Sequence, residues 1–297
     1  MDTAQSQFTR LQRIKDTANF NVDDLHHYNL LLLIGNGDFQ LCVTDPRNNR
    51  CLLVEDFQLA GAPMTDHDRL EALKVLFDGH HILTAGFWNH VKLAFKHQKF
   101  TLVPSALFIK EELAAYLALN CEPDLDAEYL HYYKHSQSDA VNVFTANQAI
   151  INWLTSIYSA SKLQLLHQGS SFIEGVLQND DHQPFRTMFL LVEANTLHVL
   201  VSQDKKLEFY NRFSIKKHDD YLKYISMVMK NLKLKADQTK VLIWGKLQND
   251  ATLFKELHQH IQHLSFGNKP AYLQFNYMFD DVPEQYYFDL FSMHLCD

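Results

Sequence analysis

Short apolar runs separated by turn residues dominate the first sixty positions of the chain. Residues 29–34, 39–44 and 51–57 are largely apolar, and polar residues or glycines interrupt them. The first interruption contains Asn36-Gly37, and Asn-Gly between two apolar runs is a strong signal for a β-hairpin. We therefore expect three consecutive antiparallel strands here. An amphipathic helix over about 66–77 should follow them.

The same order of elements returns about 155 to 160 residues later. A second set of three strands is predicted, again followed by a helix, a strand and a helix. Two copies of one element order indicate an internal duplication. In the second copy the strands are expected at 188–192, 197–202, 207–213 and 240–244, and the helices at 219–232 and 250–260.

The first copy contains additional predicted elements. They are strands at 91–95, 100–103, 129–133, 141–145 and 163–166, helices at 109–118 and 148–158, the second capped by Asn147, and a helix that Ser171–Glu174 would open as a capping box. The predicted organisation is a flexible tail over 1–19, a first half over 20–180 and a second half over 181–297. The boundary is placed in the polar stretch 179–184.

Composition and charge exclude several functional classes. The 297 residues are 46% apolar and carry a net charge of -8, so a nucleic-acid partner, which needs clustered cations, is not expected. The longest apolar run, 30–34, is far shorter than a membrane span, and residues 1–19 contain no signal-peptide core. We therefore expect a cytoplasmic protein. Its four cysteines form no CxxC pair, and Cys42 and Cys51, which flank a turn, are expected as free thiols that could face each other.

The element order over about 25–266 resembles the actin-like ATPase fold, whose two halves each have a ribonuclease-H-like core. Residues 28–57, together with 99–104 and 107–108, also resemble a family of uncharacterised bacterial proteins assigned to this fold. Pilus-assembly components are among its actin-like relatives. The resemblance implies an α/β protein with mixed sheets and two ribonuclease-H-like halves.

In active members of that fold, the first turn of each half carries Asp-x-Gly and holds nucleotide phosphates and magnesium. Here the first turn reads Gly35-Asn36-Gly37-Asp38, so glycine stands where the fold has aspartate. The second reads Glu193-Ala194-Asn195-Thr196, with a longer carboxylate and with asparagine in place of glycine. The adenosine-side Gly-Gly pair is Gly245-Lys246.

These departures predict a degenerate nucleotide cleft, because phosphoryl transfer depends on positioning and on metal-assisted charge stabilisation. We expect a catalytically degenerate actin-like protein that acts as a binding or scaffolding module, with no catalytic residue, no metal site and no cofactor. The alternative is a divergent ATPase that binds Mg-ATP between the halves through Glu193 and Thr196. The candidate cleft residues are Gly35, Asn36, Gly37, Asp38, Glu193, Asn195, Thr196 and Gly245.

Other chemistry has weaker support in the sequence. A nuclease of the ribonuclease-H type needs a carboxylate within its first strand, and neither 30–34 nor 188–192 has one. His258, His260 and His263 do not share the face that a zinc helix requires, so we expect them on the surface. The aromatic segment 272–291 should complete the core. Its alternative role is a surface for a protein partner or for self-association.

Overall fold

The computed structural model describes residues 8–61, 64–179, 185–247 and 251–297. Its first half contains the predicted meander, β2 (Asn29–Ile34), β3 (Asp38–Asp45) and β4 (Arg50–Leu59), followed by α1 (Asp66–Asp78) and β5 (His90–Phe95). Strands β2, β3 and β4 pair antiparallel, whereas β5 pairs parallel to β2. With β1 (Phe8–Lys15) and β9 (Lys162–His167) they form a six-stranded sheet in the order β1-β4-β3-β2-β5-β9.

The second half repeats this plan on a smaller scale. Strands β10 (Thr187–Glu193), β11 (Thr196–Gln203) and β12 (Lys206–Ser214) form the meander, α5 (Asp220–Asn231) follows, and β13 (Lys240–Gly245) pairs parallel to β10. Helix α6 (Thr252–His260) and the three-residue strand β14 (Leu264–Phe266) come next. Strand β14 was not predicted, because three residues are too few to show an alternation of apolar and polar side chains. The sheet order is β12-β11-β10-β13-β14.

The extra elements of the first half form a small subdomain. Its three strands, in the order β6-β8-β7, are β6 (Phe100–Pro104), β8 (Ala140–Asn147) and β7 (Glu128–Lys134). The single helix predicted over 109–118 is shorter, a 3-10 turn at Lys110–Glu112 followed by α2 (Leu113–Leu117). Helix α3 (Gln148–Ile157) begins as predicted, because the side chain of Asn147 accepts a hydrogen bond from the Ile150 N–H.

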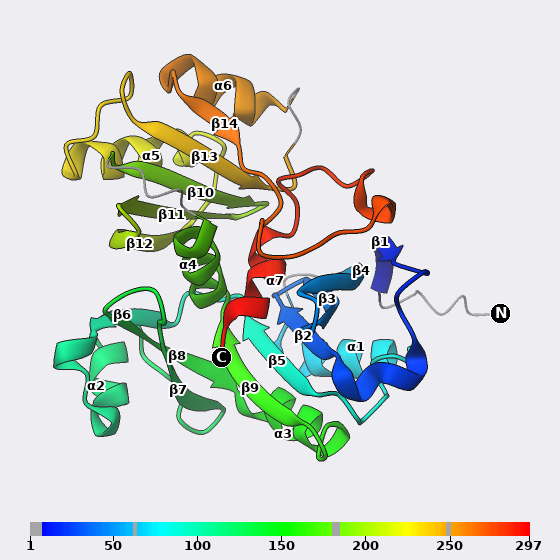
Figure 1. Cartoon of the computed structure of the whole chain (residues 1–297). Helices are drawn as coiled ribbons and strands as arrows, with labels where there is room; N and C mark the ends of the chain where they lie inside the picture. The colour runs from blue at the N-terminus through cyan, green and yellow to red at the C-terminus, as the bar shows by residue number, and fades with distance from the viewer. Residues whose placement is uncertain (1–7, 62–63, 180–184, 248–250) are drawn as a thin grey trace.

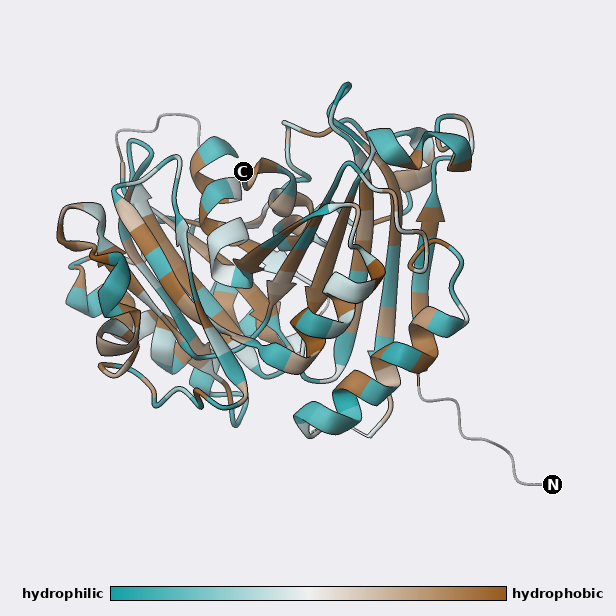
Figure 2. Ribbon diagram, turned by 90° about the horizontal axis from the view of Figure 1, so that it is seen from below, coloured by the Kyte–Doolittle hydropathy of each residue, from teal (hydrophilic) through white to brown (hydrophobic). Residues whose placement is uncertain are grey.

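The two large sheets and their helices form five layers (Figure 1). Helices α1 and α3 cover one face of the six-stranded sheet, α5 and α6 cover the outer face of the five-stranded sheet, and each pairing has its own hydrophobic core. Between the sheets lie α4 (Gln168–Asn179) and α7 (Phe288–Ser292), whose side chains join both inner faces into one core. The central strands are hydrophobic along most of their length (Figure 2), as expected for strands covered on both faces.

Two local predictions are wrong. The tail expected over 1–19 is not flexible from residue 8 onward, since Phe8–Lys15 pairs antiparallel with β4. Its alternation of polar and apolar residues was too weak to predict an edge strand. Helix α4 begins at Gln168 and not at Ser171, because β9 continues directly into it and Ser171 lies buried inside. The boundary predicted within 179–184 falls mainly on residues outside the described part of the chain.

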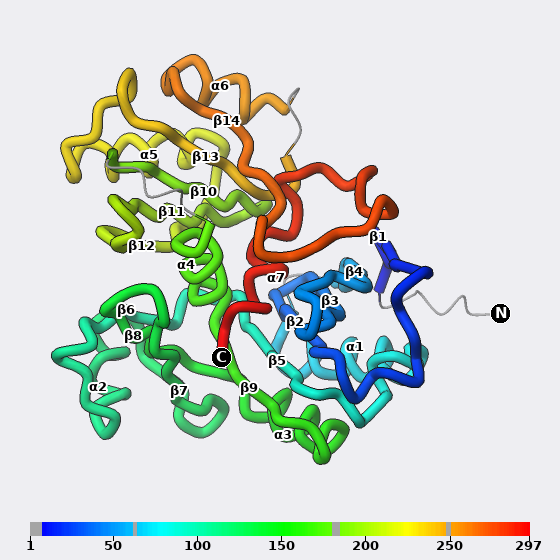
Figure 3. The backbone as a smooth tube through the Cα atoms, in the orientation of Figure 1, coloured from blue at the N-terminus to red at the C-terminus, as the bar shows by residue number. Residues whose placement is uncertain are grey.

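The C-terminal segment leaves the second half and runs between the two sheets (Figure 3). Phe279, Tyr287, Phe288 and Phe291 are buried in the central core, whereas Tyr277 is exposed. The burial supports the core interpretation of the aromatic segment for most of its residues.

No helix in the described ranges combines the length and the apolar character needed to cross a lipid bilayer.

Candidate functional site

The two turns singled out in the sequence meet at a single lysine. Lys96 directly follows β5, and its ammonium lies 2.6 Å from Asp38 Oδ2 of the first turn and 2.8 Å from Glu193 Oε1 of the second. Only 7% of the Lys96 side chain is exposed. Burial alone would lower the pKa of Lys96, but the carboxylates of Asp38 and Glu193 outweigh it and raise the pKa well above its usual value. The ammonium therefore stays charged and bridges the two halves.

Glu193 is the most highly coordinated group of the site. Its Oε1 accepts a hydrogen bond of 3.1 Å from Gln168 Nε2 at the start of α4, and its Oε2 lies 3.6 Å from His198 Nε2. Burial would raise the pKa of Glu193, but the nearby charge of Lys96 overrides it and holds the pKa well below its usual value. Burial lowers the pKa of His198 despite the nearby carboxylate, so this imidazole is neutral near pH 7.

Asp289, the second residue of α7, is a further acid at this site. Gln168 Nε2 donates to Asp289 Oδ2 at 2.7 Å, so one amide group contacts both Glu193 and Asp289. Burial raises the pKa of Asp289; the charge of Lys96 opposes this shift, and the negative charge of Glu193 adds to it. The two acids consequently differ: Glu193 is held ionised, whereas Asp289 retains its proton more readily.

The first turn is filled by its own side chain. A Cβ atom on Gly35 would lie 1.9 Å from Asp38 Oδ1, so the Asp38 carboxylate occupies the space beside the Gly35 backbone. The Gly35 N–H donates to the Asp38 carbonyl, and the Gly37 carbonyl accepts from the Leu59 N–H. Asn36 is exposed and accepts a long hydrogen bond of 3.5 Å from Arg69 of α1. The turn is thus compact, and its carboxylate points toward Lys96.

Hydrogen bonds from β12, α5 and the segment between them hold the second turn. Arg212 of β12 donates to the Thr196 hydroxyl at 3.1 Å, and the Asn195 carbonyl accepts from the Ile215 N–H. The Tyr221 hydroxyl donates to the Glu193 carbonyl at 2.6 Å. Thr196, which the ATPase interpretation assigned to magnesium, therefore already has an arginine as its partner.

Gly245 ends β13 in a conformation that favours glycine. Its φ is +124°, and a Cβ atom there would lie 2.0 Å from the Val192 carbonyl oxygen. Its N–H donates to the Gln285 carbonyl of the C-terminal segment. The next residue, Lys246, pairs with the buried carboxylate of Asp56 in β4. This end of the expected cleft is therefore also covered by the chain.

The residues present do not fit magnesium. Mg²⁺ needs oxygen ligands at about 2.1 Å, yet the oxygens of Asp38 and Glu193 face an ammonium group. At an effective dielectric constant of 20, a divalent ion 4 Å from that ammonium would be repelled by about 8 kcal/mol. The described residues contain no group of three or more His, Cys, Asp or Glu side chains arranged for a metal ion.

The three histidines and the two facing cysteines singled out in the sequence lie as expected. His258, His260 and His263 are exposed. Cys42 and Cys51 are buried free thiols whose sulfur atoms lie 3.6 Å apart across the hairpin.

The structure brings the two predicted turns together at Lys96, which was not expected from the sequence, and neither were Gln168 and Asp289. A lysine directly after the strand predicted at 91–95 was a usable signal, because parallel strands end at the same sheet edge as the first turn. Gln168 was missed because the helix was predicted to begin at Ser171, whereas α4 begins at Gln168. Asp289 lies about 95 residues from Glu193 in sequence, and no local pattern links them.

Comparison with known proteins agrees with this architecture. A model of the family described as "Protein of unknown function (DUF3822)" matches residues 17–264. The chain belongs to the DUF3822 family. No curated protein matches the sequence.

The fold of this DUF3822 protein is the actin-like ATPase fold. A crystal structure from Bacteroides thetaiotaomicron, described as having this fold and unknown function, shares 16% identity with it at a TM-score of 0.78, covering 94% of this chain and 99% of that one. PilM from the PilM–PilN type IV pilus biogenesis complex is similar at 12% identity and a TM-score of 0.60, covering 90% of this chain and 97% of that one. The resemblance stated from the sequence is confirmed at the level of family and fold.

Proposed function

We propose that this DUF3822 protein is a catalytically degenerate actin-like protein that serves as a cytoplasmic binding or scaffolding module. The observation that carries the proposal is the position of Lys96. Its ammonium neutralises the two carboxylates that would have to orient a metal ion, and the same contacts tie the two halves together. Mg-ATP binding would have to break both ion pairs, which are largely buried, before any compensating contact could form.

The similarity to PilM supports a binding role. That neighbour was determined in a complex with PilN, so an actin-like scaffold of this size can act by holding a partner protein.

Thermal unfolding in the presence of nucleotide tests the proposal. The wild-type chain should show no rise in melting temperature with millimolar ATP or ADP, with or without Mg²⁺, and no phosphate release above background. Lys96→Met removes the ammonium between Asp38 and Glu193 and is therefore the variant that tests its role. Lys99→Met is its control, because Lys99 forms an ion pair with Glu128 outside the site. A Mg-ATP-dependent rise in the wild type that Glu193→Gln abolishes would contradict the proposal.

A divergent Mg-ATP-dependent ATPase is the second candidate. One observation favours it: a single side chain reaches both turns, so the acidic groups converge at one point. This function requires Lys96 to leave the position between Asp38 and Glu193. Phosphate release by the wild type that depends on Glu193 would establish it.

A further inference from the structure

The inserted subdomain carries an apolar surface that the rest of the chain leaves uncovered. Leu113, Tyr116 and Leu117 of α2 face the small core beneath the helix. The outer side of the helix and the turn after it is apolar as well, because Ala114, Ala115, Ala118 and Leu119 are all exposed. Leu119 is 80% exposed. Ala114 and Ala115 lie on the exposed side of α2, and Ala118 and Leu119 follow directly after its last residue, Leu117, so we describe these apolar side chains together as one stripe.

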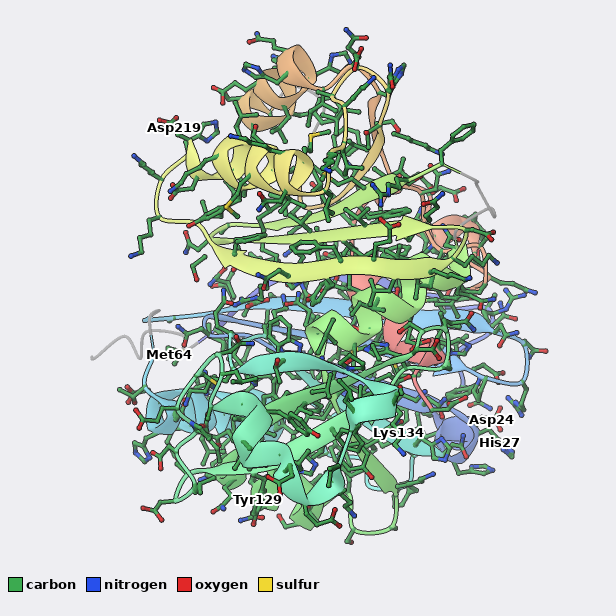
Figure 4. All side chains as sticks on the ribbon, turned by 90° about the vertical axis from the view of Figure 1, so that its left-hand side faces the viewer. Asp24, His27, Met64, Tyr129, Lys134 and Asp219 are labelled. Carbon is green, nitrogen blue, oxygen red and sulfur yellow. The ribbon has the colours of Figure 1, made fainter. Side chains whose placement is uncertain are left out.

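The loop before α2 extends this stripe. Leu107 and Ile109 are 66% and 55% exposed. The Tyr116 hydroxyl donates to the Leu107 carbonyl at 2.6 Å and accepts from the Ile109 N–H at 3.0 Å, so both residues are held beside the helix. We call Leu107, Ile109, Ala115 and Leu119, with their carboxylate neighbours Glu111, Glu112 and Glu122, the α2 surface. Figure 4 looks toward this subdomain, with Tyr129 and Lys134 labelled at the two ends of β7.

The charge around the apolar stripe is predominantly negative. Residues 105–127 contain five carboxylates, those of Glu111, Glu112, Glu122, Asp124 and Asp126, against the single ammonium of Lys110. None of the five forms an ion pair with a described residue, and all are exposed. This short segment carries a net charge of -4, half of the -8 of the whole chain. An exposed apolar stripe with an acidic rim complements a partner in which apolar and basic side chains alternate.

We infer that the α2 surface is a docking site for a basic, amphipathic segment of a partner protein, whose leucine-like side chains cover the stripe while its lysines or arginines pair with the rim. A second copy of this chain is disfavoured as the occupant, because two acidic chains repel each other. The inference rests on the proposed binding role and adds the place and the chemistry of the partner.

Binding of a labelled amphipathic peptide of leucine and lysine, followed by fluorescence anisotropy, tests the inference. The wild-type chain should bind it, and Leu119→Ser and the double variant Glu111→Gln/Glu112→Gln should each weaken binding by about tenfold. Tyr277→Ser and Asp280→Asn/Asp281→Asn are the matched controls, since they remove an equally exposed large side chain and an adjacent exposed acid pair from the second half. These controls should bind as the wild type does.

Several outcomes would overturn the inference. They are no binding, equal binding by all variants, equal binding of a peptide of leucine and glutamate, and loss of binding in the Tyr277 or Asp280/Asp281 controls. A concentration-dependent dimer that Leu119→Ser dissociates would assign the surface to a second copy instead. Because nucleotide is absent from this experiment, its failure leaves the thermal-shift result on Mg-ATP unaffected.

Discussion

Burial and the Lys96 ammonium together set the protonation of Glu193 and Asp289. Glu193 lies 2.8 Å from this charge and is held ionised. Asp289 accepts a hydrogen bond from Gln168, and burial raises its pKa although the Lys96 charge acts in the opposite direction, so it keeps its proton more readily. Two acids that share one amide donor therefore respond to pH in opposite ways. Variants that remove the charge of Lys96 or of Asp289 should reveal these different pH dependences of stability.

Lys96→Met should destabilise the fold most strongly at neutral pH. The variant leaves Asp38 and Glu193 close together without a cation, and removing one partner of a buried pair costs about 3 to 5 kcal/mol. Because the native pKa of Glu193 is lowered, the ion pair stabilises the wild type above about pH 4 and is lost as the pH falls further. The difference in unfolding free energy between wild type and variant, measured with urea, should therefore shrink toward low pH. If this difference in unfolding free energy does not change with pH, the assignment of a Lys96–Glu193 ion pair is contradicted.

Asp289→Asn should have the opposite effect on stability from Lys96→Met: it should stabilise the fold at neutral pH. The native pKa of Asp289 is raised, so this acid stabilises the fold at low pH and loses that contribution as the pH rises through its native pKa. An asparagine oxygen can still accept from Gln168 but does not ionise. We expect the variant to match the wild type near pH 4 and to be more stable at pH 7 in urea unfolding. A variant that is less stable than the wild type at pH 7 would show that Asp289 is ionised there and is stabilised by a nearby positive charge.

The candidate site illustrates what a sequence conveys at this scale. The two turns could be predicted because hairpin signals are local, and their separation by a duplicated unit placed them in corresponding positions. The lysine that joins them, and the acid of α7, belong to contacts between residues distant in sequence. No period or short motif records such contacts.

At the level of elements, the prediction succeeded where an apolar run was long enough and was bounded by residues that favour turns. The meanders β2–β4 and β10–β12 are confirmed within one or two residues. Three elements were misjudged for physical reasons. β1 is an edge strand with mostly polar exposed side chains, α2 is a single short turn of α-helix after a 3-10 turn, and α4 has no sequence cap because β9 leads directly into it.

The end of β13 offers a test at this scale. Gly245→Ala places a Cβ atom against the Val192 carbonyl at a φ of +124°, so the end of the strand must shift. We expect a loss of at least about 2 kcal/mol in unfolding free energy. Gly61→Ala is the control, because its φ is +84° but nothing lies within 4 Å of the added carbon, and it should cost about 1 kcal/mol. Equal losses in thermal or urea unfolding would mean that β13 tolerates the shift.

At the level of the whole molecule, buried polar contacts connect the two halves at several separate places. Besides Lys96, the carboxylate of Asp56 in β4 accepts from the Tyr287 hydroxyl at 3.0 Å and pairs with Lys246 after β13. Asn276 donates to Asp16 at 2.9 Å. These contacts make the C-terminal segment part of the junction between the sheets, and they explain why its aromatic residues are mostly buried.

Tyr287→Phe should therefore lower stability, although it keeps the ring. It removes a hydrogen bond to the buried Asp56, which costs about 1 to 2 kcal/mol. Tyr286→Phe removes a hydroxyl with no hydrogen-bond partner among the described residues and should change the unfolding free energy by less than about 0.5 kcal/mol. Differential scanning calorimetry of both variants tests this ordering. Equal effects would place Tyr287 outside the junction.

Helix α4 lies between the two sheets, and ten of its residues in a row are buried. Two of its glycines face close neighbours: an added carbon on Gly169 would meet the Tyr210 ring, and one on Gly175 would meet Ser292. Selection should accordingly hold both positions at glycine among related proteins, while the exposed face of the inserted subdomain is free to diversify with whatever each lineage binds. A family alignment would then show invariant glycines in α4 and variable residues on the exposed face of the subdomain. This contrast would separate the positions that keep the molecule folded from those that distinguish one relative from another.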